Sequence, residues 1–274
     1  MRKGFLPILL VAAMVLSMTS CSVNKAKIDN SLKKYFDSAN VDGCFSFANN
    51  QSGEVTVYNI GLDTQRFLPA STFKIVNSLI GLETGRITDE KMVIKWDGVP
   101  RNPAWDKDLT MEEAFKVSAV PYYQEVARRI GKDTMQHWLD TLGYASRYGK
   151  AIIKTHIDSF WLDNSIKISA DEELGLVKKL YFDQLPFQKR TQELVKKVML
   201  QEQTPKYTLY YKTGWGFKED GSGLGWIVGW IEENKHVYFF AMNMEGPHDI
   251  NMVPIRRNAL TGILKQLGFF EGKK

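Results

Sequence analysis

The stretch "LPASTFKIVNSLIGLETG", residues 68–85, decides how this chain is interpreted. Ile75, Leu79 and Leu82 recur at helical spacing, and Gly85 is a typical helix stop. Ser71 and Lys74 are three residues apart, so on a helix they lie on one face about one turn apart. The stretch therefore predicts a helix that begins at the serine and carries the lysine one turn inside.

A serine and a lysine in this arrangement could form a nucleophilic site. Unpaired amides at a helix start can stabilise a developing oxyanion next to the Ser71 hydroxyl. Lys74 stands between Phe73 and Ile75, and desolvation there would lower its pKa and free its amine. Ser-x-x-Lys also occurs by chance in many proteins, so the pair needs a second motif.

The second motif is Lys212-Thr213-Gly214, which we expect at the end of a strand and which Trp215 follows. An exposed strand edge can dock a peptide-like substrate through backbone hydrogen bonds. Lys and Thr could hold a carboxylate there, and Gly permits close backbone approach. Ser-x-x-Lys followed by Lys-Thr-Gly is the motif set of serine penicillin-recognising enzymes.

Ser118-Ala119-Val120 points to a subclass, because penicillin-binding proteins and class A enzymes usually have Asn where Val120 stands. With this apolar residue the chain resembles the class D (oxacillinase-like) β-lactamases over roughly residues 40–267. The resemblance also rests on "RNPAWDKDLT" (101–110), Tyr148-Gly149, "FWL" (160–162) and the last three strands.

The resemblance implies a role for each catalytic residue. Ser71 would be the acylated nucleophile. Lys74 would react with CO₂ or bicarbonate to give an N-carboxylated side chain that acts as general base, with no metal and no organic cofactor. Ser118 would pass a proton to the leaving β-lactam nitrogen, and Lys212 would assist electrostatically.

An apolar pocket around Lys74 would favour the neutral amine that captures CO₂. The residues expected to form this carbamate pocket are Phe73, Val120, Trp161 and Leu162. Trp161 offers one indole N–H donor, which could bind the carbamate; the alternative is a plain core tryptophan.

Substrate binding follows from the same resemblance. The backbone N–H groups of Ser71 and Trp215 would form the oxyanion hole. Thr213 and an arginine of "VPIRRNALTG" would hold the substrate carboxylate, with Arg256 favoured and Arg257 as the alternative. The expected substrate-binding residues are Thr213, Gly214, Trp215 and Arg256.

One position departs from the family, which usually has Tyr-Gly-Asn where this chain has Tyr148-Gly149-Lys150. Lys150 cannot accept a hydrogen bond, so the bonds of the Asn side chain must be met differently. Lys150 is therefore interpreted either as a changed site residue or as a surface residue.

The order of elements predicts an α+β fold. Residues 43–59 alternate around "NNQSGE" as a hairpin, about 107–200 are rich in helical patterns, and three aromatic strands and a final helix close the chain. We therefore expect an antiparallel sheet from N- and C-terminal strands, flanked by helices, with a helical subdomain inserted. The catalytic domain would span residues 22–274.

The first 21 residues are typical of a secretory signal. Arg2 and Lys3 precede the apolar run "FLPILLVAAMVLSM" and then Ser20-Cys21. We expect a lipoprotein-type signal with a lipid anchor at Cys21 and a periplasmic, membrane-anchored protein; ordinary cleavage nearby is the alternative. Cys44 is then a lone thiol in a strand pattern, and a buried apolar role is favoured over catalysis.

Other function classes have less support. The chain has 274 residues, 44% hydrophobic content and a scattered net charge of +5, which does not demand nucleic acid as a partner. Its four histidines show no metal spacing, and "ADEELG" (170–175) is interpreted as a solvated helix start. The rivals to a β-lactamase are a β-lactam sensor domain, a D,D-peptidase and a structural lipoprotein with a decayed site.

Overall fold

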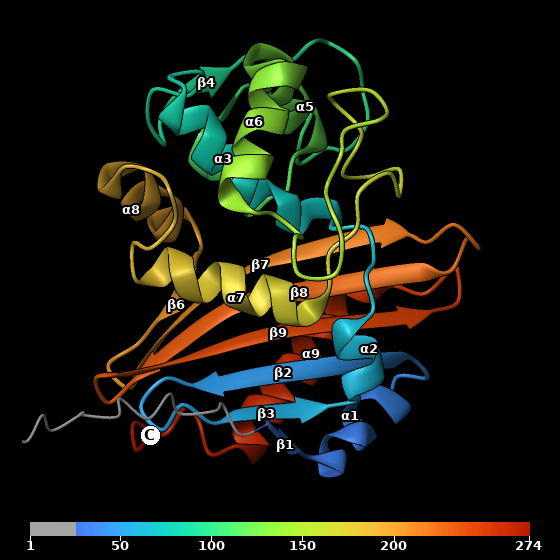
Figure 1. Ribbon diagram of the computed structural model, residues 1–274, viewed down its shortest axis with the longest axis vertical. Coiled ribbons are helices and arrows are strands. Elements are labelled where there is room, and N and C mark those ends of the chain that lie inside the picture. The colour runs from blue at the N-terminus through green and yellow to red at the C-terminus, as the bar shows by residue number, and fades with distance from the viewer. Residues whose placement is uncertain (1–25) are drawn as a thin grey trace, which may run out of the picture.

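A single large sheet organises the protein, whose computed structural model describes residues 26–274 (Figure 1). The sheet has seven strands in the order β1-β3-β2-β9-β8-β7-β6. Their bounds are β1 Ala26–Ile28, β2 Asp42–Asn49, β3 Val55–Tyr58, β6 Leu200–Gln203, β7 Tyr207–Phe217, β8 Gly223–Glu233 and β9 His236–Gly246. The N-terminal hairpin β2–β3 thus joins the C-terminal strands through the β2–β9 pairing, which confirms the predicted α+β fold.

The predicted secretory segment 1–21, with Cys21, lies outside the described residues. The described chain begins with β1, which pairs in parallel with β3, and continues into the short helices η1 Asn30–Lys33 and α1 Lys34–Asp37. Within residues 26–274, no helix combines the length and the apolar character needed to span a membrane.

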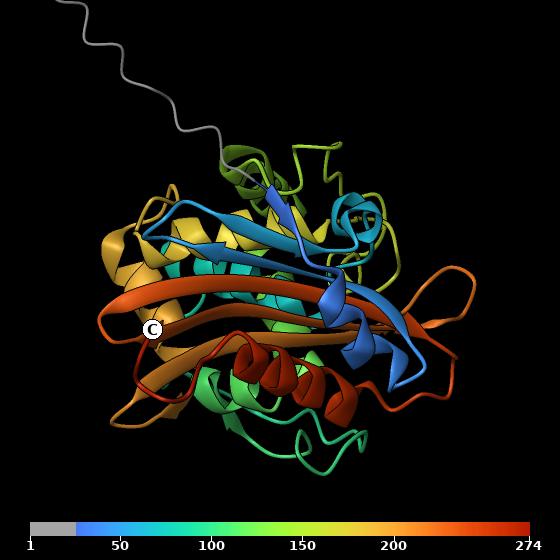
Figure 2. The ribbon, with the colours of Figure 1, turned by 90° about the horizontal axis from the view of Figure 1, so that it is seen from below.

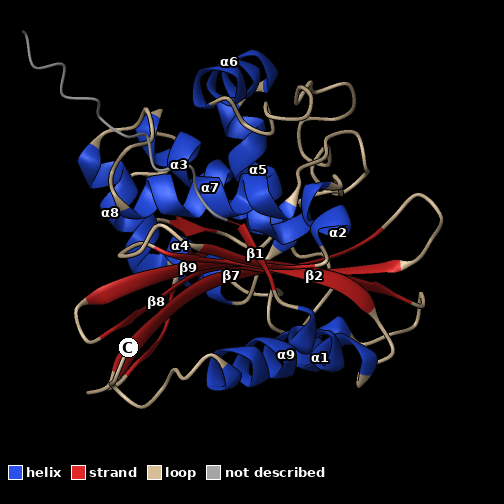
Figure 3. Ribbon diagram, turned by 60° about the horizontal axis from the view of Figure 1, so that its bottom comes forward, coloured by secondary structure: helices blue, strands red, loops and turns tan. Residues whose placement is uncertain are grey.

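Helices cover both faces of the sheet (Figure 3). One face carries α1 and the C-terminal helix α9 Met252–Gln266, which runs along the strands in Figure 2. The opposite face carries the inserted helical part. Its elements are α2 Ile60–Thr64, η2 Ala70–Phe73, α3 Lys74–Glu83, α4 Met111–Lys116, α5 Val120–Ile130, α6 Lys132–Leu142, α7 Ala170–Tyr181, α8 Lys189–Val198 and the small ribbon β4 Val93–Ile94 and β5 Leu109–Thr110.

Strand β9 shows why both faces are covered. Successive side chains of a strand point to opposite faces, so a strand buried on both sides is apolar throughout. Phe239 and Ala241 belong to the core under the helical part, whereas Phe240 and Met242 belong to the core under α9. The run "HVYFFAMNM" is the sequence signature of this double burial.

Local signals fix several helix ends. Thr110 and Glu113 form a capping box at the start of α4, and Ser169 and Glu172 form a second one at α7. Helix α3 ends at Glu83, and Gly85 follows with φ of 68°, a conformation that glycine adopts readily.

Three expectations need correction. Ser71 does not begin the α-helix but lies in the 3₁₀ turn η2, and α3 begins at Lys74. Lys212-Thr213-Gly214 lies inside β7, because β8 continues to pair with it as far as Phe217. The start of α7 is not fully solvated, since Glu173 is completely buried.

Candidate active site

Ser71 and Lys74 form a buried pair at the junction of η2 and α3. Lys74 Nζ donates a hydrogen bond to Ser71 Oγ at 2.7 Å. Lys74 is fully buried, and burial lowers its pKa to about 7. The ring of Tyr123, on α5, lies 5.5 Å from the Lys74 nitrogen. A large fraction of the amine is therefore neutral near pH 7, as a base or nucleophile requires.

The turn that carries Ser71, residues 68–73, is held in an uncommon backbone conformation; we call it the nucleophile turn. Ala70 has φ of 49°, in the left-handed region that non-glycine residues rarely adopt. Two contacts hold the turn there. Ala70 N donates to Trp161 O at 3.0 Å, and Trp226 Nε1 on β8 donates to Leu68 O at 2.9 Å. The sheet and the helical part thus fix the serine together.

Aromatic side chains form the wall beside Lys74. Phe73 stacks on Trp161 with ring centroids 5.5 Å apart, and Phe160 and Tyr144 meet Phe73 edge-on. Trp161 is completely buried, and its Nε1 has no hydrogen-bond partner among the described residues. Burying an indole N–H without a hydrogen-bond acceptor costs free energy, and a carboxylate would be a suitable acceptor for it.

The other two predicted pocket residues are only partly buried. Val120 is the first residue of α5 and is half-buried. Leu162 is half-buried and packs against the core cluster that contains Phe73. Together with the unpaired Trp161 N–H and the lowered pKa of Lys74, these apolar residues fit an N-carboxylated lysine.

A second hydroxyl–lysine pair joins the helical part to the sheet. Lys212 Nζ on β7 donates to Ser118 Oγ at 2.9 Å and to Thr213 O at 3.0 Å. Ser118 stands between α4 and α5 with φ of 59°. Burial, followed by the nearby charge of Lys74, lowers the pKa of Lys212 well below its usual range. The turn η2, which carries Ser71, packs directly against β7, which carries Lys212, so the two pairs lie in one site.

Arg256 reaches the same strand from α9. Its Nη1 donates to Gly214 O at 2.6 Å, and its side chain is buried whereas Arg257 is exposed. Burial lowers the pKa of Arg256 to about 10, so it remains a cation at neutral pH. Its Nε has no partner among the described residues. The geometry places Arg256, and not Arg257, against the Lys-Thr-Gly segment.

Strand β7 has an open edge at this segment. Its pairing with β6 ends at Tyr210, whereas its pairing with β8 continues to Phe217. Thr213 is half-buried and Trp215 is 41% exposed, so this part of the strand faces solvent. A Cβ on Gly214 would lie 3.1 Å from Trp226 Cβ and 3.2 Å from Pro69 O, which shows how closely β7 approaches the nucleophile turn.

Lys150 lies on the surface. It is exposed and pairs with Asp140 at 3.5 Å. Its neighbour Tyr148 is also exposed and donates a hydrogen bond to Asp171 Oδ2 at 2.7 Å. The surface interpretation of Lys150 therefore agrees with the structure.

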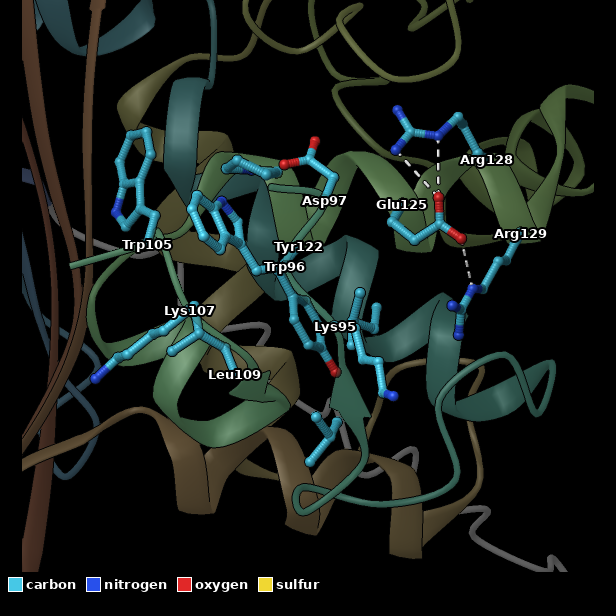
Figure 4. A pocket seen from close by; sticks show the side chains of 13 residues that line it. Lys95, Trp96, Asp97, Trp105, Lys107, Leu109, Tyr122, Glu125, Arg128 and Arg129 are labelled. Carbon is cyan, nitrogen blue, oxygen red and sulfur yellow. Dashed lines mark hydrogen bonds and ion pairs between the residues drawn. The ribbon is translucent and has the colours of Figure 1, made fainter. Parts of the chain in front are cut away.

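A separate cavity of about 440 Å³ opens on the helical part (Figure 4). Glu125 lies between Arg128 and Arg129 on one side of it, and Trp105 on the other. Among the described residues that line it, neither member of the Ser71–Lys74 pair appears. Trp105 connects it to the site, because its Nε1 donates to the carbonyl of Val117, next to Ser118.

Several site residues have no motif in the sequence. Tyr123 could have been suspected, because it lies three residues after Val120 on one helix. Phe115, whose ring lies 5.4 Å from Lys212 Nζ, and Trp226 meet the site only through tertiary contacts. Between residues 26 and 274, no group of three or more His, Cys, Asp or Glu residues is placed to hold a metal ion. Cys44 is buried, as expected.

Known proteins resemble this chain in both sequence and architecture. A family profile described as penicillin binding protein transpeptidase domain matches residues 33–261. β-Lactamase OXA-5 of Pseudomonas aeruginosa is 40% identical over 242 residues, which cover 87% of this chain and 89% of that one. β-Lactamase OXA-48 of Klebsiella pneumoniae is 43% identical over 209 residues, which cover 76% and 77%.

Solved structures agree. The crystal structure of the class D β-lactamase FUS-1 (OXA-85) of Fusobacterium nucleatum superposes with a TM-score of 0.82 at 34% identity, over 88% of this chain and 99% of that one. The class D β-lactamase from Bacillus subtilis gives 0.78 at 37%, over 88% and 98%. The chain therefore belongs to the penicillin-binding transpeptidase family and, within it, to the class D β-lactamases.

Proposed function

We propose that this enzyme hydrolyses penicillin-type β-lactams, and so confers resistance to them, through an acyl-enzyme on Ser71, with N-carboxylated Lys74 as general base. The observation that carries the proposal is the buried Lys74 amine, 2.7 Å from Ser71 Oγ and with a pKa lowered to about 7. The neutral fraction of this amine is what CO₂ can add to. The carboxyl group, when bound, supplies a carboxylate base beside the serine hydroxyl.

Acylation follows from the positions of the two hydroxyl–lysine pairs. Ser71 Oγ gives up its proton toward Lys74 as it attacks the lactam carbonyl carbon, and the carbon–nitrogen bond of the ring then breaks. Ser118 relays this proton to the departing nitrogen, and Lys212, 2.9 Å from Ser118 Oγ, orients that hydroxyl and assists electrostatically. The backbone N–H groups of Ser71 and Trp215 stabilise the oxyanion.

Deacylation uses the same groups. Water gives up a proton toward Lys74 as it attacks the ester carbon, the ester bond to Ser71 Oγ breaks, and that proton returns to Ser71 Oγ while the opened product leaves. Trp161 acts by fixing the position of the base, because its free Nε1–H is available to a carboxylate. The apolar wall of Phe73, Val120 and Leu162 limits competing solvent around Lys74.

The substrate carboxylate is held between the two elements that meet at Gly214. Thr213 offers a hydroxyl on the open edge of β7, and Arg256 brings a buried guanidinium to the carbonyl of the next residue. A guanidinium presents several donors in one plane, so it can keep its bond to Gly214 O and still bind a carboxylate. Gly214 and Trp215 let the substrate backbone approach the strand.

We also propose that the protein is exported as a lipoprotein, with residues 22–274 as the mature catalytic domain in the periplasm. The support is the order of a basic segment, an apolar run and small residues before Cys21. A Cys21→Ser variant should move the enzyme from the membrane fraction to the soluble periplasmic extract. An unchanged membrane association would contradict a lipid anchor at this cysteine.

Intact-protein mass spectrometry after mixing with a penicillin tests the catalytic proposal. The wild type should show a transient adduct of the mass of the drug, and Ser71→Ala should show none. Lys74→Ala should form the adduct slowly and then retain it, because acylation and deacylation both lack their base. A wild-type adduct that persists without turnover would instead indicate a sensor. Unaltered turnover by Ser71→Ala would overturn the proposal.

A further inference from the structure

A buried carboxyl group lies against the nucleophile turn and takes no part in the mechanism above. Glu173, in the first turns of α7, is completely buried. Its Oε1 lies 2.5 Å from the hydroxyl of Thr72, the residue that follows Ser71. The same Thr72 hydroxyl lies 2.8 Å from Pro69 O, and Pro69 is also in the nucleophile turn.

The charge of Glu173 depends on how many hydrogens Glu173 Oε1, Thr72 Oγ1 and Pro69 O have between them for hydrogen bonding. A threonine hydroxyl has one hydrogen, and a carbonyl oxygen has none. If Thr72 donates to Pro69 O, its contact with Glu173 is a hydrogen bond only if the carboxyl group donates. A protonated Glu173 therefore satisfies both contacts as one chain, from Glu173 to Thr72 Oγ1 and from there to Pro69 O.

The surroundings of Glu173 favour the uncharged form. Its Oε2 has no hydrogen-bond partner among the described residues, which is costly for a buried carboxylate. From α7 the acidic neighbour is Glu172, whose partner is Arg66, with Arg66 Nε 3.7 Å from Glu172 Oε2. From the segment after α6 comes the phenol of Tyr144.

The other elements that pack against α7 are β2, β8, β9, α2 and α8. The α8 lysines Lys196 and Lys197 pair with Asp183 and Glu90, and among the described residues the charge that acts on the pKa of Glu173 is that of Glu172. Within the described part of the chain, Glu173 thus has acidic or neutral neighbours.

We propose that Glu173 is a positioning residue that must be uncharged in the active enzyme, where it holds the Ser71 turn through Thr72 and Pro69. The inference rests on the proposed role of Ser71 as nucleophile. Pro69 O is also the atom that Gly214 approaches, so the chain fixes the turn at its contact with the substrate-binding strand.

Ionisation of Glu173 would weaken this arrangement. Burial raises the pKa of Glu173 to about 7. Above that pH the carboxylate accepts the Thr72 hydrogen, and Pro69 O loses its hydroxyl donor. Acylation of Ser71 should therefore fall on an alkaline limb, by about tenfold, the effect of one lost hydrogen bond of roughly 1.4 kcal/mol at the reacting geometry.

The test compares wild type with Glu173→Gln, whose amide is always neutral and can donate to Thr72. Stopped-flow acylation by a penicillin is followed across pH, with bicarbonate in excess so that charging of Lys74 does not limit the rate. Glu193→Gln, at an exposed position of α8, is the control for loss of a carboxylate. Thr72→Val and the double variant Thr72→Val/Glu173→Gln show whether the two residues act as one unit.

A second readout does not depend on Ser71. Because the folded-state pKa of Glu173 is raised from 4.5 to about 7, the folded protein binds the extra proton between these values. The urea midpoint of wild type should therefore fall as pH rises through this window, and Glu173→Gln should fall less steeply.

We expect Glu173→Gln to lose the alkaline limb of the acylation rate and Glu193→Gln to keep it. The urea midpoint of Glu173→Gln should change less with pH than that of wild type. The double variant should be acylated no more slowly than Thr72→Val. An alkaline limb of the same midpoint and depth in Glu173→Gln would overturn the inference and assign that limb to another group such as Lys212. An unchanged urea profile would also overturn it, because Glu173 would then be ionised throughout. If Ser71 is never acylated in wild type, the proposed function fails, and the urea profile still reports the charge of Glu173.

Discussion

The nitrogen of Lys74 lies 2.7 Å from the hydroxyl oxygen of Ser71, at a position where the lysine is completely buried. Burial is the cause of the lowered pKa of Lys74. A buried cation without a charged partner is unfavourable, so burial favours the neutral, reactive form of the Lys74 amine beside the Ser71 hydroxyl. The predictions below follow from this relationship.

Trp161 can be tested by removing only its N–H group. Trp161→Phe keeps an aromatic ring to stack on Phe73 but has no donor for a carboxylate. Hydrogen bonds to charged groups contribute about 1.5–3 kcal/mol, so steady-state turnover should fall by roughly 10- to 100-fold. High bicarbonate should recover part of the loss. Turnover equal to wild type at low bicarbonate would show that Trp161 is only a core residue.

Arg256 and Arg257 form a matched pair, since one is buried against Gly214 and the other is exposed. Arg256→Lys keeps a cation but loses the planar fork, and we expect KM for a penicillin to rise by roughly tenfold or more. Arg257→Lys should change KM by less than about twofold, as expected of a surface site. Steady-state kinetics measure both KM values. A larger rise in KM for Arg257→Lys than for Arg256→Lys would assign binding of the substrate carboxylate to Arg257.

Lys74 should cost stability in a pH-dependent way. Its folded-state pKa is lowered from 10.5 to about 7, so between these values the unfolded chain binds a proton that the folded protein does not. Stability of wild type therefore rises with pH through this window. Lys74→Met should be more stable than wild type by a few kcal/mol below about pH 7, with the difference shrinking toward pH 10.5. Urea denaturation measures this difference in stability. A Lys74→Met variant less stable than wild type, or a stability difference that does not change with pH, would contradict a buried lysine without a charged partner.

Activity should show an acidic limb that depends on bicarbonate. CO₂ adds only to the neutral amine, so at limiting bicarbonate turnover should rise as pH increases through about 7. Because ligand binding and proton release are linked, raising bicarbonate should move the limb to lower pH. Chromogenic cephalosporin hydrolysis at several bicarbonate concentrations checks this. A limb at one fixed pH would assign the titration to a group other than Lys74.

Much of the site could be predicted because its residues lie in local motifs. Ser71 with Lys74, the Ser118 segment and Lys212-Thr213-Gly214 are each short runs, and the fold brings them together. The capping box at Thr110 and the β2–β3 hairpin are likewise local. Family resemblance added what spacing alone does not contain, namely the expectation that Lys74 is carboxylated.

The remainder depends on contacts between distant segments. The hydrogen bond from Trp226 to Leu68 O joins residues 158 positions apart, and the contact of Glu173 with Thr72 joins residues 101 positions apart. No periodicity in the sequence marks either contact. The polar run at 170–175 predicted a solvated helix start, but the face of α7 that meets the sheet buries Glu173. The parallel pairing of β1 with β3 has no sequence signal either, because three residues are too few to show a strand pattern.

The central claim is that Lys74 must be carboxylated to act as the base. The most direct test is turnover of a chromogenic cephalosporin in CO₂-depleted buffer, before and after bicarbonate is added, for wild type and for Lys74→Ala. The account predicts that depleted wild type loses activity and regains it with bicarbonate, and that Lys74→Ala stays inactive in both conditions. Wild-type turnover that is the same with and without bicarbonate, at a pH below about 7 where the carbamate is least favoured, would contradict it.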